Sequence, residues 1–167
     1  MEKIFLKPTH TEILIKGPQK EGHLDIFSYD YNADETKRKL GNLYIVGSIQ
    51  PDIEALKDSI PGEKVGESDV TYITNLVASL AKREYYSDPD LSPKEAFSAT
   101  LKKINGVVDE FFVNKETKIN IGIFALAGEN INISKIGKFK ILLARDNKTI
   151  DILNNIDLFT KEKVEEK

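Results

Sequence analysis

The chain contains no cysteine and no tryptophan, and only one methionine and two histidines among its 167 residues. The lack of cysteine excludes disulfides, thiolate metal sites and a cysteine nucleophile, and it favours the cytoplasm over an oxidising compartment. No apolar run approaches the roughly 18 to 20 residues of a membrane-spanning helix. The first residues, Met-Glu-Lys-Ile-Phe-Leu-Lys-Pro, also lack the apolar segment of a signal peptide. We therefore expect a cytoplasmic protein whose sequence inserts no segment into a membrane.

A strong excess of one charge is missing as well. The 24 Lys and Arg side chains nearly balance the 27 Asp and Glu side chains, and acids and bases are interspersed. Because no basic stripe could neutralise phosphates, we expect no binding of DNA or RNA. The 40% of hydrophobic and 31% of charged residues are typical of a globular protein. We predict one domain over residues 1–158, followed at 159–167 by a charged tail or the start of a linker.

Short apolar segments follow one another between Asn120 and Leu153. Three turn signals separate them: Gly128-Glu129-Asn130, Gly137-Lys138 and Asp146-Asn147-Lys148. This spacing predicts an antiparallel meander of four strands. Both faces of its first strand are apolar, with Ile119, Ile121 and Ile123 on one side and Phe124 and Leu126 on the other. Such a strand needs cover on both faces.

Four more short strands are predicted earlier in the chain, at Lys3 to Leu6, Glu12 to Lys16, Leu24 to Tyr31 and Leu43 to Val46. The last of these is a continuous apolar run, which suits a strand buried on both faces. The polar segment Asn32 to Lys39 predicts a loop, and Pro51 to Ile60 predicts a short helix.

Two stronger amphipathic helices are predicted in the middle of the chain. Ser68-Asp69 can cap the first helix, while Ser92 can cap the second, with Pro93 at its first position and Glu95 completing a capping box. Their apolar faces consist of Val70, Ile73, Val77, Leu80 and Ala81 in the first, and Phe97, Leu101, Ile104, Val108 and Phe111 in the second. The short connection between them favours antiparallel packing.

From Gly22 to Leu153, this order of elements resembles the metal-dependent Ser/Thr protein phosphatases of the 2C type. An early strand of that family carries Asn-Glu/Gln-Asp, and Asp25 is the acid that this chain keeps there. The next strand of the family leads into Ala-Asp-Gly-Met-Gly-Gly, whose Asp bridges two metal ions. Ser48 stands at that Asp, and Ile49 stands at the following Gly. In the meander, Lys138 stands where the family has the Asp of a Gly-Asp pair.

The resemblance implies an α+β fold, a four-layer αββα sandwich in which helices flank two antiparallel sheets. It also implies that the family's chemistry is lost. Two divalent ions about 3.5–4 Å apart need several carboxylates, whereas a serine is a poor ligand and a lysine adds positive charge. We therefore expect no catalytic, metal-binding or cofactor-binding residue. The expected function is that of a pseudophosphatase, which binds a protein partner or regulates an attached downstream module.

One alternative is a divergent metal-dependent phosphohydrolase with a rearranged acidic site. Such an enzyme must bring three or more acids into one cleft, out of Asp25, Asp30, Asp34, Asp52 and Asp146. A second alternative, the N-terminal nucleophile hydrolase fold, has weak support because no processed Thr, Ser or Cys begins the chain.

Three other features have both a functional and a structural interpretation. His10 and His23 could share a metal ion if their strands pair, although surface histidines are commoner. The segment from Gly62 to Gly66, which contains Lys64, is weakly similar to a phosphate loop, but an ordinary loop is the better interpretation. Tyr85-Tyr86 indicates packing at a helix end, while exposed tyrosines there could anchor a partner.

Overall fold

The structure is a computed structural model that describes residues 9–13, 23–31, 34–51, 67–112, 117–138 and 140–152. The chain forms two compact units, Met1–Gly137 and Lys138–Lys167. The strand predicted at Lys3 to Leu6 and nearly all of the helix predicted at Pro51 to Ile60 lie outside the described residues. Glu12 and Ile13 are described and belong to no strand.

The first unit contains a four-stranded antiparallel sheet in the order β1-β2-β3-β4. Its strands are β1 (His23–Tyr29), β2 (Asn42–Pro51), β3 (Thr117–Ala127) and β4 (Asn130–Ile136). The predicted strands near residues 24–31, 43–46 and 120–127 are therefore confirmed, with changed ends. Paired residues share one face of an antiparallel sheet, so the register fixes which side chains lie together.

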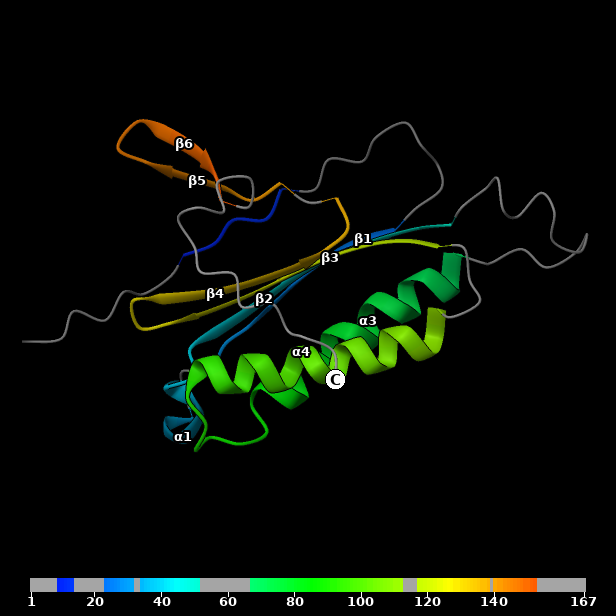
Figure 1. The fold of residues 1–167 in the computed structure, drawn as a ribbon. Helices are drawn as coiled ribbons and strands as arrows, with labels where there is room; N and C mark the ends of the chain where they lie inside the picture. Colours follow the sequence, from blue (N-terminus) through cyan, green and yellow to red (C-terminus); the bar gives the residue numbers. More distant parts are fainter. Residues whose placement is uncertain are drawn as a thin grey trace, which may run out of the picture. The chain divides into compact units, whose positions relative to one another are not determined.

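The two predicted amphipathic helices are α3 (Glu67–Tyr85) and α4 (Pro93–Phe112), and they pack side by side on one face of this sheet (Figure 1). The capping box of α4 is confirmed. Ser92 Oγ and the Ser92 backbone amide bond to Glu95 Oε2 at 2.6 and 3.0 Å, and the Glu95 amide donates to Ser92 Oγ at 3.3 Å. The cap predicted at Ser68-Asp69 is wrong, because α3 begins earlier and contains both residues.

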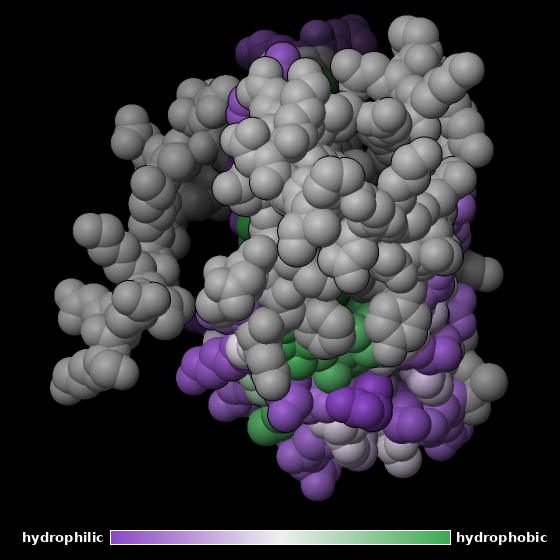
Figure 2. Space-filling model, turned by 90° about the vertical axis from the view of Figure 1, so that its right-hand side faces the viewer, coloured by the Kyte–Doolittle hydropathy of each residue, from purple (hydrophilic) through white to green (hydrophobic). Residues whose placement is uncertain are grey.

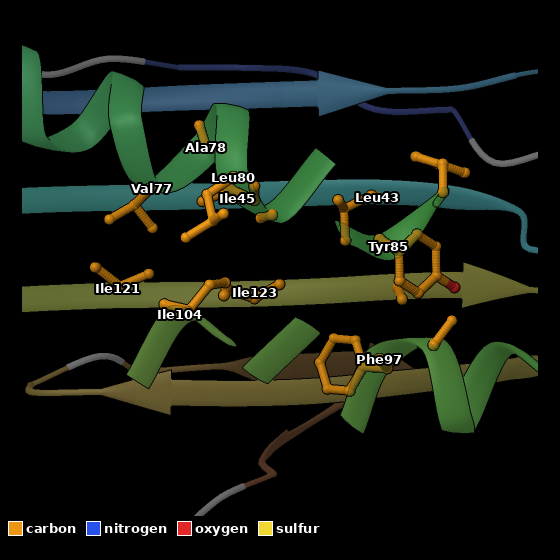
Figure 3. Close-up of a cluster of buried hydrophobic side chains, with 14 of the residues drawn as sticks. Leu43, Ile45, Val77, Ala78, Leu80, Tyr85, Phe97, Ile104, Ile121 and Ile123 are labelled. Atoms are coloured by element: carbon orange, nitrogen blue, oxygen red, sulfur yellow. The ribbon is translucent and has the colours of Figure 1, made fainter. Parts of the chain in front are cut away.

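The core lies between the two helices and the sheet. Figure 3 shows apolar side chains from the strands pointing toward those of the helices: Leu43, Ile45, Ile121 and Ile123 toward Val77, Leu80, Phe97 and Ile104. All of these are buried. Leu101 and Val108 are half-buried and pack against the core. The side of the helices that faces solvent carries exposed polar residues, among them Ser79, Arg83, Ser98 and Lys102. Figure 2 likewise shows mainly hydrophilic side chains on the described surface that it presents, around a smaller hydrophobic area.

The loop predicted at Asn32 to Lys39 is wrong, because a short helix, α1 (Glu35–Arg38), forms there. Asp34 caps it: its Oδ1 accepts hydrogen bonds from the amide and the hydroxyl of Thr36, at 3.1 and 2.6 Å. An acid in the first turn and bases in the last turn suit the helix dipole. These signals were present in the sequence, but the segment is too short to show an apolar period.

The second unit contains a hairpin of β5 (Leu142–Arg145) and β6 (Lys148–Asp151). Asp146 and Asn147 both have positive φ, 51° and 58°, as a two-residue turn of type I′ requires. This turn and the predicted turn at Gly128-Glu129 are therefore confirmed, and Gly137 has a positive φ, but the four-strand meander is wrong. Among the described strands, β5 and β6 pair with each other and form a sheet separate from that of β4.

The protein is an α+β protein with two antiparallel sheets and a few helices, as predicted at this level. Within the described ranges, no helix is long and apolar enough to cross a membrane.

Candidate functional site

Asp25 in β1 is the acid that the phosphatase resemblance singles out, and it lies on the helix-facing side of the sheet. Its Oδ2 accepts a hydrogen bond of 2.7 Å from the Thr74 hydroxyl of α3. Gly47 pairs with Asp25 and has no side chain to hold α3 away; a Cβ there would lie 3.4 Å from Thr74 Cγ2. Thr74 is buried. Asp25, itself half-buried, therefore joins the sheet to α3.

Ser48, which the resemblance aligns with the metal-bridging Asp of the phosphatase family, lies on the other face of the sheet. It pairs with Leu24 and Asn120, each one residue away from a helix-facing position. Because successive side chains of a strand point to opposite faces, the Asp25 and Ser48 side chains point away from each other. The two positions that the resemblance assigns to one metal centre do not converge. Lys138, the third such position, is exposed and begins the second unit.

The remaining acids have separate surroundings. Asp34 caps α1, and the pKa of its carboxyl is lowered, chiefly by the hydrogen bond from the Thr36 side chain. Asp30 is exposed just after β1, while Asp146 lies in the β5–β6 turn and pairs with Arg145 at 3.5 Å. Asp52 lies outside the described residues. Among the residues that the structure does describe, no group of three or more His, Asp or Glu side chains could hold a metal ion.

His10 lies against Tyr44 of the sheet and beside Glu12. Its ring meets the Tyr44 ring edge-on with centroids 5.4 Å apart, and its Nε2 lies 3.6 Å from a carboxylate oxygen of Glu12. The His23 side chain and the segment Gly62 to Gly66 lie outside the described part, so the two-histidine site and the phosphate-loop interpretation remain untested.

Tyr85 and Tyr86, at the end of α3, are buried, which confirms the interpretation that they pack at the helix end. The alternative, that they anchor a partner, required exposed tyrosines. The Tyr85 hydroxyl donates to the Leu40 carbonyl at 2.7 Å, and the Tyr86 hydroxyl donates to the Gly41 carbonyl at 2.8 Å. Both carbonyls belong to the short turn between α1 and β2. The two tyrosines therefore fix this turn to the end of α3, an arrangement that we call the tyrosine latch.

A cluster of aromatic rings and lysines that the sequence did not predict surrounds the tyrosine latch. The Tyr31 and Tyr86 rings are 4.4 Å apart. Lys37 Nζ lies 4.8 Å from the Tyr31 ring centroid, and Lys82 Nζ lies 4.9 Å from the centroid of Tyr29. Such contacts between a cation and a ring contribute on the order of 0.5–1 kcal/mol at exposed sites. The alternation of Tyr29 and Tyr31 was a visible signal, but their neighbours on α1 and α3 come from distant parts of the sequence.

The face of the sheet opposite the helices, which we call the outer face, is also largely apolar. Its apolar members are Leu24, Ile26, Tyr44, Val46, Phe124, Leu126, Ile131 and Ile133. Most are half-buried, but Ile131 is 55% exposed and Leu24 is 38% exposed. The prediction that β3 is apolar on both faces is thus confirmed.

No protein-family model matches the chain, and no curated protein or solved structure gives a significant match.

Replacing Tyr85 by phenylalanine is expected to lower the free energy of unfolding by about 1–3 kcal/mol, because the buried Leu40 carbonyl loses its donor. Urea denaturation measures the loss. Tyr31→Phe, at a half-buried ring of the same cluster, is the control and should cost less. Equal losses in the two variants would contradict the role of the Tyr85 hydrogen bond.

The same hydroxyl predicts a dependence on alkaline pH. Burial raises the pKa of Tyr85 from 10.0 to about 12. The folded pKa therefore lies above the unfolded value, so the contribution is complete below pH 10.0 and is lost as the pH rises toward about 12. Denaturation curves across this range should show the decline in the wild type, with a smaller decline in Tyr85→Phe.

Proposed function

We propose that the chain is a non-catalytic domain with a reduced 2C-type phosphatase fold, which binds a protein partner or regulates an attached module. The observation that supports this most directly is the orientation of Asp25. Its carboxylate accepts a hydrogen bond from the buried Thr74 of α3 and lies on the opposite side of the sheet from Ser48. A binuclear centre needs acids that converge on a water-accessible cleft, and here the acid serves the packing of a helix on a sheet.

Two of the other acids, Asp34 and Asp146, support the same proposal because each has a local structural role. Asp34 completes the first turn of α1 through its Oδ1, and Asp146 occupies a turn in which φ is positive. A carboxylate that caps a helix is held by donors on its own segment and would have to give them up to bind a metal ion. The proposed fold has four layers, an αββα sandwich, of which α3, α4 and the four-stranded sheet would be two.

Turnover of p-nitrophenyl phosphate with added Mn²⁺ tests this proposal. We expect no metal-dependent turnover from the wild type, from Asp25→Asn or from the control variant Asp90→Asn, whose acid is exposed between α3 and α4. Metal-dependent turnover that is lost in Asp25→Asn and retained in Asp90→Asn would overturn the proposal. It would support the divergent metal-dependent phosphohydrolase instead.

A further inference from the structure

The strand β4 forms one edge of the four-stranded sheet. Within the described residues it is hydrogen-bonded along one side, to β3, and not along the other. The helix α3 packs over β1 and β2, and α4 packs over β3. Ile131 is 55% exposed and Ile136 is 38% exposed, and Lys135 is the one charged residue in the strand. An edge strand with exposed apolar side chains and little charge is a template for pairing with another strand.

The sequence of β4 is complementary to itself in one antiparallel register. A two-fold axis through Asn132 places Ile131 opposite the partner's Ile133 and Asn130 opposite the partner's Ser134. Residues that are opposite in an antiparallel pair point to the same face. In this register apolar side chains meet on the outer face, while the small polar side chains meet on the helix-facing side.

Charge complementarity selects the same register. It brings Glu129, the turn residue immediately before β4, beside the partner's Lys135, and the two-fold axis makes this pair twice. Moving the axis to Ile133 would place Lys135 opposite the partner's Ile131. Moving it to Ile131 would place Glu129 opposite the partner's Ile133. Each shifted register therefore sets a charge against an isoleucine.

We infer that two copies of this chain associate through β4, antiparallel and with the two-fold axis at Asn132, and join their sheets into one. Such an interface is isologous, so it uses both β4 edges and closes as a dimer instead of growing into a fibre. It continues the apolar outer face from one copy to the next and buries Ile131, the most exposed apolar side chain described in the sheet. The inference does not depend on the proposed function, since it needs neither catalysis nor its absence.

Cysteine cross-linking tests the register directly because the chain has no cysteine of its own. Opposed residues of an antiparallel pair have Cα atoms about 4.5–5.5 Å apart, within the range that a disulfide spans. Under mild oxidation, Asn132→Cys should form a covalent dimer in most of the protein. Ser28→Cys, exposed on β1 at the opposite edge of the sheet, is the matched control and should remain mainly monomeric. Equal cross-linking of both variants, or none in either, would overturn the inference.

Charge reversal provides the second test, with sedimentation equilibrium as the measurement. The wild type should show twice the mass of one 18.8 kDa chain. Glu129→Lys and Lys135→Glu should each raise the dimer dissociation constant roughly tenfold, because two attractive pairs become repulsive. The double variant should restore the wild-type value. Three results would each contradict the association. They are a monomeric wild type, binding of a different protein at β4 in place of the second copy, and single variants whose dissociation constants match that of the wild type.

Discussion

Replacing Gly41 by alanine is expected to lower the free energy of unfolding by about 2–5 kcal/mol, combining left-handed backbone strain with forced displacement of a neighbour. Gly41 has a φ of +72°, a region that residues with a Cβ rarely adopt. An added Cβ would also meet the Leu126 carbonyl oxygen and would lie 2.7 Å from Ala127 Cα. These are backbone atoms of β3, so no side chain can rotate away to relieve the contact.

The matched control for this prediction is Gly128→Ala. Gly128 has a similar φ of +59°, but an added Cβ there would meet nothing within 4 Å. The control should therefore cost only the conformational strain, about 1–2 kcal/mol. Urea denaturation of both variants separates the two contributions. If Gly41→Ala costs no more than Gly128→Ala, the close approach of the α1–β2 turn to β3 is wrong.

Phe97→Ala is expected to lower the free energy of unfolding by about 3–5 kcal/mol, because it removes a large side chain from the core and leaves a cavity. Phe97 is 6% exposed and lies between α4 and the rest of the core (Figure 3). The Leu101→Ala variant should cost less, since Leu101 is half-buried.

Ser98→Ala is the control for Phe97→Ala, because Ser98 is the next residue of α4 and its side chain is exposed. Surface substitutions of this kind usually stay within about 0.5 kcal/mol. Guanidinium denaturation of the two variants gives the comparison. A loss below about 0.5 kcal/mol in Phe97→Ala would mean that the apolar face of α4 does not meet the sheet.

The helices could be predicted well because their signals are local. Ser92, Pro93 and Glu95 lie within four residues of one another, and the structure gives them the predicted capping box. The turn residues Gly128, Gly137 and Asn147 were equally local, and all three have positive φ. A positive φ at Gly137 does not decide whether the strands on either side of it pair, and the meander prediction failed there.

The candidate site could be predicted less well because it depends on register. A shift of one residue moves every side chain of a strand to the other face, and the sequence does not say whether Asp25 pairs with Gly47 or with Ser48. The structure pairs it with Gly47 and so directs its carboxylate to Thr74, which lies 49 residues away in sequence. The tyrosine latch was missed in the same way, because Tyr85 meets Leu40 across 45 residues.

Asp25 accepts a hydrogen bond from Thr74 of α3, and we propose that it binds no metal ion. Thermal unfolding of the wild-type protein with and without Mn²⁺ tests it most directly, because a metal ion that binds the folded state must stabilise it. Free Mn²⁺ at 100 times its dissociation constant would raise the free energy of unfolding by about 2.7 kcal/mol. We predict the same midpoint of unfolding with and without Mn²⁺. A midpoint that rises with Mn²⁺ in the wild type, and no longer rises in Asp25→Asn, would contradict the claim.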